Sequence, residues 1–164
     1  MQSYAACLEK FTGKKLSEIP GTGAAGGLGF AFLWGLPNVE LKPGIDIVLE
    51  AVGLTNELKD ADVVVTGEGC LDFQTAMGKV PVGVAKTAKN YNCKVIAFAG
   101  SVTEEAKKCN EKGIDAFFSI LPGVCSLDEA MDTEIAQKNM RNAAEQVFRL
   151  ILTLLKVTNN VTKS

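Results

Sequence analysis

The sequence predicts an α/β fold built on a doubly wound, Rossmann-like parallel sheet of about three strands. From Asp60 onward, short apolar runs alternate with helical segments, which is typical of strand–helix–strand units. The runs within 63–66 and 94–99 are continuously apolar rather than alternating. Strands of this kind have helices on both faces of the sheet, so we expect three layers. Three strands are fewer than the roughly four to six of a usual open sheet, which suggests that the sheet is incomplete.

The first part of the chain is expected to contain helices and no strand. An amphipathic helix at 4–11 should end at Gly13, and a glycine- and alanine-rich stretch follows at 21–29. Pro43 suits the first turn of another helix, because the N–H that proline lacks has no intrahelical partner there. Apolar residues at three- and four-residue spacing give that helix one apolar face before it ends near Gly53.

The remaining elements follow in alternation. The strand at 63–66 is expected to break off at Gly67 and to lead into a polar loop, and the next helix should open near Val80. This helix is expected to cover 82–91. It is followed by a strand at 94–99, a helix at 103–112 and a strand at 116–120.

The C-terminal part is expected to be helical. Ser126 and Glu129 form a capping-box pattern, which marks a helix start. The helix that follows should pack on the sheet and end in a polar tail after residue 157. Its apolar stripe consists of Ala136, Met140, Ala143, Val147, Ile151 and Leu154.

The overall composition excludes several classes of function. The net charge is −2 without a basic run, so a nucleic-acid partner is not expected. No apolar stretch is long enough to span a membrane, and no secretory signal is visible. The five cysteines are scattered, which favours reduced thiols in the cytoplasm over disulfides or zinc. With no histidine in the chain, acid–base chemistry must come from Asp, Glu, Lys or Tyr.

Polar side chains follow the first strand in unusual density. They are Glu68, Asp72, Gln74, Thr75 and Lys79. Carboxylates can hold Mg²⁺ or accept a hydroxyl proton, and a lysine near a helix start can balance phosphate charge. The alternative is that these residues only cap and turn the loop between strand and helix.

The glycine-rich stretch has three interpretations. Residues 21–26 match G-x-G-x-x-G, but a dinucleotide site needs a strand immediately before it, and Pro20 disfavours one. Close packing of a helix on another backbone is the plainest interpretation. The third is that backbone N–H groups of Gly23, Ala24, Ala25, Gly26 and Gly27 bind an anion at a helix N-terminus.

Four segments resemble the bacterial glycerate kinase family. Residues 60–85 resemble its T-G-E-G-R-x-D-x-Q-T-x-x-G-K-x-P-x-G-V-A signature. Residues 20–29, 40–45 and 95–102 resemble its P-G-x-G-A-A-G-G-L-G, E-L-x-P-G-I and V-I-A-x-A-G-S-V elements. The resemblance implies ATP-dependent phosphorylation of D-glycerate, with Mg²⁺, in a cleft between two α/β domains.

The resemblance covers only the C-terminal half of that family's sequence. On this basis, residues 1–58 are the helical, Gly-rich end of an inserted second α/β domain. Residues 59–157 are the C-terminal part of the Rossmann-like domain, and 158–164 are a tail. The chain is therefore expected to be inactive alone, lacking an N-terminal half or pairing with a second copy. The alternative is a non-catalytic fragment or ligand-binding module that needs a partner chain.

The resemblance also suggests roles for the polar residues. Glu68, Asp72 and Lys79 are expected to be catalytic: Glu68 and Asp72 would bind the metal, and Lys79 would neutralise phosphate charge. Gln74 and Thr75 would orient the substrate, and residues 23–27 would bind an anion. One position departs from the family pattern: Cys70 replaces the arginine that follows G-E-G. A thiol cannot reproduce the two-pronged hydrogen bond of a guanidinium group, so activity is altered if that arginine binds substrate.

Overall fold

The computed structural model describes residues 2–13 and 15–161, which divide between Val52 and Gly53 into two compact units. The sequence analysis placed a domain boundary slightly later, after residue 58. The two units are described separately below. In the described residues, no helix is long and apolar enough to cross a membrane.

The first unit contains three helices, and its described residues form no strand, in agreement with the sequence. The helix after Pro43 begins one residue later than predicted, because Pro43 is its N-cap with an extended ψ of 133°. The rings of Tyr4 and Phe30 pack edge to face with centroids 6.4 Å apart, which connects two of the helices. The helices are α1 (Gln2–Thr12), α2 (Ala24–Gly35) and α3 (Gly44–Ala51).

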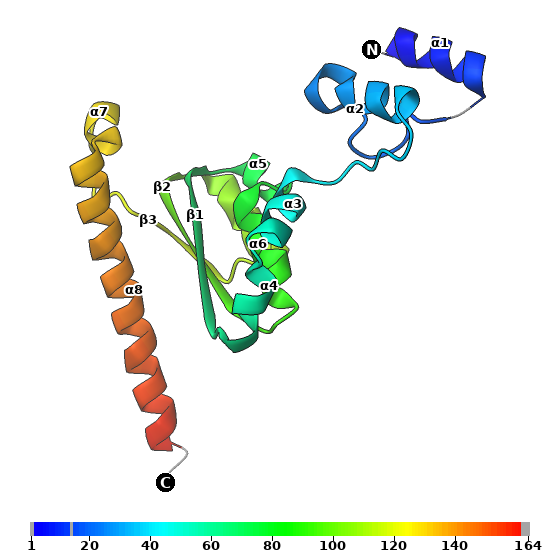
Figure 1. The fold of residues 1–164 in the computed structure, drawn as a ribbon. Helices are drawn as coiled ribbons and strands as arrows, with labels where there is room; N and C mark the ends of the chain where they lie inside the picture. The colour runs from blue at the N-terminus through cyan, green and yellow to red at the C-terminus, as the bar shows by residue number, and fades with distance from the viewer. Residues whose placement is uncertain (1, 14, 162–164) are drawn as a thin grey trace. The chain divides into compact units, whose positions relative to one another are not determined.

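The second unit contains a parallel three-stranded sheet in the order β1-β2-β3, with helices between the strands (Figure 1). The sequence predicted the α/β class and all three strands. In chain order the elements are α4 (Leu54–Glu57), η1 (Leu58–Asp60), β1 (Val63–Leu71), α5 (Phe73–Ala76), α6 (Val80–Lys89), β2 (Lys94–Val102), η2 (Glu104–Lys112), β3 (Ala116–Ser119), α7 (Leu127–Met131) and α8 (Thr133–Val161).

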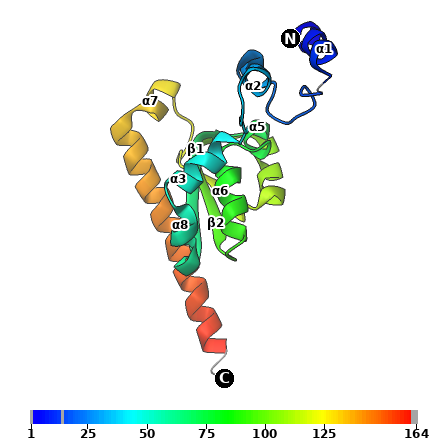
Figure 2. The same cartoon turned by 45° about the vertical axis from the view of Figure 1, so that its right-hand side comes forward.

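The sheet has helices on both faces, as the apolar runs predicted (Figures 1 and 2). On one face, α6 and η2 bury a core with the sheet that includes Val82, Val95 and Cys109. On the other face, α8 packs against Ile96 and Phe98 through Val147 and its neighbours Ala143, Ala144 and Ile151. The apolar stripe of the last helix therefore packs on the sheet over its central part, as expected.

The prediction that β1 breaks off at Gly67 is wrong. The strand continues to Leu71, and β2 likewise continues past Gly100. A Cβ atom on Gly67 would lie 2.3 Å from the carbonyl oxygen of Phe98, and one on Gly100 would lie 2.8 Å from that of Gly69. The glycines therefore allow close backbone approach inside the sheet, instead of ending the strand.

Both long strands change face near their carboxyl ends. In β2, Val95, Ala97 and Ala99 lie on the α6 side, as the alternation of a strand requires. Val102 also packs on that side, although alternation would place it on the opposite face. In β1, Val64 and Leu71 share the same side despite their odd separation. The pairing offset stays constant from Val63–Lys94 to Leu71–Val102, so both strands shift together, around Gly69 and Gly100.

Other differences from the sequence prediction are local. The segment predicted as a helix at 103–112 is a 3₁₀ helix, η2, which begins after its N-cap Thr103. The capping box at Ser126 and Glu129 is present and starts α7. Helix α8 runs to Val161, beyond residue 157 where the polar tail was predicted to start, and residues 162–164 lie outside the described part.

Candidate functional site

Three of the predicted site residues form one hydrogen-bonded network at the end of β1. Asp72 is the N-cap of α5, and its carboxylate Oδ1 accepts the backbone N–H of Thr75 at 3.0 Å. The Thr75 hydroxyl in turn accepts the backbone N–H of Asp72 at 3.3 Å and donates to Oε1 of Glu68. Thr75 is completely buried. Thr75 therefore connects the two carboxylates, Asp72 through its backbone N–H and Glu68 through its hydroxyl.

Lys79 belongs to the same site. Its Nζ lies 3.8 Å from Oδ1 of Asp72, and its side chain remains 44% exposed. Lys79 is also the N-cap of α6, where the helix dipole adds positive potential. Asp72 and Lys79 therefore lie together, as a phosphate site in this segment requires.

The charge state of the site follows from these contacts. The pKa of Asp72 lies below its ordinary value of 3.8, mainly because its carboxylate accepts the backbone N–H of Thr75, with the Lys79 ammonium contributing. Asp72 is therefore ionised at neutral pH. On the inner side of the site, burial raises the pKa of the Cys109 thiol, and the charges of Glu68 and Asp72 raise it further. The thiol thus stays protonated and is a poor nucleophile.

The carboxylates of this site could share a metal ion with a substrate, but they are too few to supply all of its ligands. Within the described part of the chain, no group of three or more Asp, Glu, Cys or His side chains is placed to hold a metal ion. Magnesium is usually bound by one or two carboxylates together with substrate phosphates and water. The pair of Glu68 and Asp72 matches that pattern.

The side chains of the other predicted residues do not join this network. Gln74 is exposed, and Cys70 is half-buried near the end of β1. The stretch 23–27 belongs to the first unit, where Ala25, Gly26 and Gly27 adopt left-handed φ angles of 50°, 70° and 100° at the start of α2. Turns and not a strand precede it, which disfavours the dinucleotide interpretation. Beside it lies a cavity of about 350 Å³ that Ala24 and Lys42 help to line.

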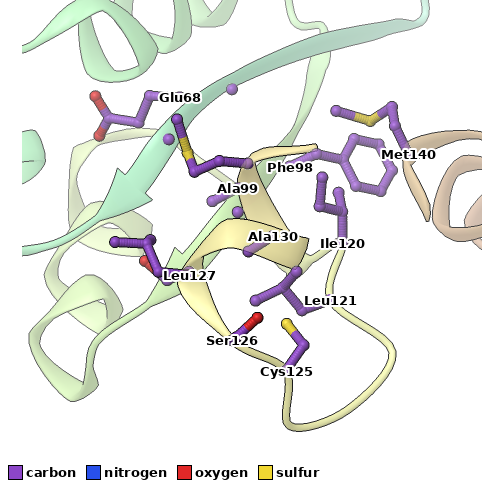
Figure 3. A pocket seen from close by; sticks show the side chains of 15 residues that line it. Glu68, Phe98, Ala99, Ile120, Leu121, Cys125, Ser126, Leu127, Ala130 and Met140 are labelled. Carbon is purple, nitrogen blue, oxygen red and sulfur yellow. The ribbon is translucent and has the colours of Figure 1, made fainter. Parts of the chain in front are cut away.

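The structure also contains a cavity that the sequence reasoning missed. A space of about 620 Å³ lies at the carboxyl ends of the strands, next to α7 and α8 (Figure 3). The only signal in the sequence was the apolar residues beside the Ser126 capping box, such as Leu127 and Met131, which lie outside the α8 stripe. Its main apolar lining residues are Phe98, Ile120, Leu121, Leu127, Met131 and Met140.

Comparison with known proteins identifies the family. The sequence profile of the Glycerate kinase family matches residues 1–152. The chain belongs to the glycerate kinase family. The resemblance found in the four sequence segments is thereby confirmed, and it covers nearly the whole chain.

Individual members of the glycerate kinase family agree with this assignment. A glycerate kinase of Bacillus subtilis is 44% identical over 88% of this chain and 38% of its own length. A glycerate 2-kinase of Escherichia coli is 44% identical over 79% of this chain and 34% of its own length. The crystal structure of a candidate glycerate kinase 2 from Salmonella typhimurium has a TM-score of 0.65 and 39% identity, over 93% of this chain and 38% of its own. The chain thus spans little more than a third of these relatives.

Proposed function

We propose that this chain is the C-terminal portion of a glycerate kinase, which phosphorylates D-glycerate with ATP and Mg²⁺ and is inactive without the rest of the enzyme. The observation that supports this most strongly is the network of Glu68, Thr75 and Asp72 with Lys79 beside it, in a chain of this family. Residues 1–58 and 59–157 would then be the C-terminal parts of two domains.

The residues present can supply what phosphoryl transfer needs, which is mostly positioning and charge stabilisation. Glu68 and Asp72 would hold Mg²⁺, which would neutralise negative charge on the phosphate oxygens. Lys79 would bind a phosphate oxygen, because its ammonium group is half-exposed and stands at a helix N-terminus. The exposed amide of Gln74 would bind the substrate.

Thr75 has a more specific role than the sequence suggested. Its side chain is fully buried, and its hydroxyl donates to the Glu68 carboxylate and accepts the backbone N–H of Asp72, which favours a positioning role over direct contact with a substrate. Backbone N–H groups at residues 23–27 remain our proposal for binding an anion, supported by the neighbouring cavity, which Ala24 lines together with Lys42, a residue that also pairs with Glu40. We also propose the 2-hydroxyl of glycerate as the acceptor, because one relative is a glycerate 2-kinase.

The decisive experiment is a chimera. The segment of the Bacillus subtilis glycerate kinase that matches this chain is replaced by this chain, and ADP release is measured with ATP, Mg²⁺ and D-glycerate. We expect turnover, with 2-phosphoglycerate identified by ³¹P NMR. Asp72→Asn should lower kcat by about 100-fold or more, because it removes a charge at the reacting centre. A folded chimera without turnover would refute the proposal, unless Cys70→Arg restores activity.

The rival interpretation is a non-catalytic module that needs a partner chain. It is favoured by the short span of this chain relative to its relatives. The module interpretation predicts a folded chimera that binds ATP or glycerate without turning over, also after Cys70→Arg. In both cases, the isolated 164-residue chain should release no more ADP than its Lys79→Ala variant.

A further inference from the structure

The cavity beside α7 has an apolar interior with few polar groups. Its volume is about 620 Å³, within the range of small-molecule sites. Its lining includes Phe98, Leu127, Met131 and Met140. Figure 3 shows Ile120, Leu121 and Ala130 on the same cavity. Such a space suits a flat, largely apolar group.

Gly69 lines the cavity, and packing within the protein does not require a glycine at this position. A Cβ atom on Gly69 would have no other protein atom within 4 Å, whereas one on Gly67 or Gly100 would collide with a backbone oxygen. Its φ also lies outside the left-handed range. The open space in front of Gly69 is therefore available for close approach of a ligand to the backbone.

The cavity adjoins the charged site through Glu68. This residue lines the cavity, but its carboxylate bonds to Thr75 and points away from the apolar side chains (Figure 3). One segment of β1 thus has an apolar cavity on one side and the charged network on the other. Both lie at the carboxyl ends of parallel strands, where open α/β sheets bind nucleotides. A ligand that occupies both the cavity and the charged network needs an apolar ring system joined to an anionic group.

We propose that this cavity binds the purine base of the nucleoside triphosphate, with the phosphates extending past Gly69 toward Lys79. The inference rests on the proposed function, because it names the place of the phosphoryl donor. It assigns a binding role to Gly69, Leu127, Met131 and Met140, none of which belongs to the charged network.

Methionine NMR provides a direct test on the full 164-residue chain. The chain has four methionines, of which Met131 and Met140 line the cavity, while Met77 is exposed two residues before Lys79. With ¹³C-methyl methionine, millimolar adenosine should shift the signals of Met131 and Met140 and leave Met77 unchanged. Tripolyphosphate should leave the two cavity signals unchanged. Absence of the adenosine shifts would overturn the proposal.

Two filling variants and one matched control sharpen the result. Gly69→Val and Ala130→Leu should each weaken adenosine binding about 10-fold or more, because both put atoms into the cavity. Gly123→Ala should not, since this glycine also has no neighbour within 4 Å but lies outside the cavity lining. Unchanged affinity in a filling variant that melts like the parent would contradict the proposal. If one variant fails to fold, the other decides.

Two further outcomes separate this inference from the proposed function. If p-cresol shifts the methionine signals as strongly as adenosine does, the cavity is a general apolar site and the purine assignment is wrong. If adenosine binds as predicted while the folded chimera shows no turnover, also after Cys70→Arg, the base site stands and the kinase proposal fails. If the chimera is active and Gly69→Val leaves its KM for ATP unchanged, the base site is wrong and the kinase proposal stands.

Discussion

At the scale of single residues, Thr75 determines how the two carboxylates are held. Its hydroxyl contacts both Glu68 and the backbone of Asp72, and no part of it is exposed. A buried group that loses a hydrogen-bond partner loses its interaction without regaining water. The side chain should therefore matter for both stability and activity, although it does not reach the solvent.

Two substitutions of Thr75 distinguish the contribution of its hydroxyl group from that of its methyl group. Thr75→Ala should lower the free energy of unfolding by about 1–3 kcal/mol, since it leaves buried polar groups without their partner. It should also reduce kcat of the chimera more than it changes KM. Thr75→Ser keeps the hydroxyl and should restore most of kcat, at a stability cost of about 1 kcal/mol for the lost methyl. Urea denaturation and steady-state kinetics measure both effects, and equal kcat values for Ala and Ser would argue against a positioning role.

The lowered pKa of Asp72 predicts a pH dependence of stability. Because the pKa is lower in the folded state, the ionised carboxylate stabilises the fold at pH values above the ordinary pKa of 3.8. This contribution is lost as the pH falls through 3.8 and then through the lower value of the folded state. Asp72→Asn keeps a capping side chain but cannot ionise.

The measurement is a comparison of unfolding free energies for the parent and Asp72→Asn at several pH values. The difference should be constant above about pH 5 and shrink toward acid, as the linkage of proton binding to folding requires. The comparison is needed because Glu9, Glu105, Asp115 and Glu129 also have lowered pKa values. A difference that does not vary with pH would show that the Asp72 charge is not stabilised by folding.

At the scale of elements, β1 and β2 depend on glycines for close packing. Gly67→Ala should destabilise the fold by about 1–3 kcal/mol, because the new methyl would overlap the Phe98 carbonyl oxygen and force the strands apart. Gly69→Ala is the matched substitution in the same strand, and it meets no atom. Its unfolding free energy should stay close to that of the parent. Similar losses in the two variants would contradict the packing argument.

The same strands show what the sequence could and could not predict. The apolar runs at 63–66 and 94–99 predicted buried parallel strands, because each run carries its signal locally. Gly67 was misinterpreted as a strand end, since only the position of the Phe98 carbonyl reveals why glycine is needed there.

The site was also predicted only in part. The polar residues around Asp72 were found because they are dense in the sequence, but the burial of Thr75 depends on α5 packing against η2, which no local pattern encodes. The large cavity was missed because its lining comes from five separate elements and loops.

At the scale of the whole molecule, the sheet ends on both sides without a further strand among the described residues. β1 is one of these edges and pairs only with β2. Val65 on this strand is 49% exposed. Long apolar edge strands tend to pair with other chains. Among the described residues, no further strand pairs with this edge of β1.

We therefore expect the isolated chain to self-associate. Light scattering coupled to size exclusion should give a dimer or a larger species, and Val65→Lys should shift it toward the monomer, because a charge on the edge opposes strand pairing. Lys86→Glu, on an exposed position of α6, is a control that should leave the assembly unchanged. A parent chain that is monomeric at high concentration would refute this expectation.

The joint change of face around Gly69 and Gly100 limits how this part of the sheet can vary. A one-residue deletion in β1 before Leu71 would move that side chain out of the α6 core while Val102 stayed in place, and the constant pairing offset would be lost. A matching deletion in β2 would restore the offset. Insertions and deletions in these two strands should thus be tolerated in pairs, so homologous sequences that differ in length here should differ in both strands by the same amount.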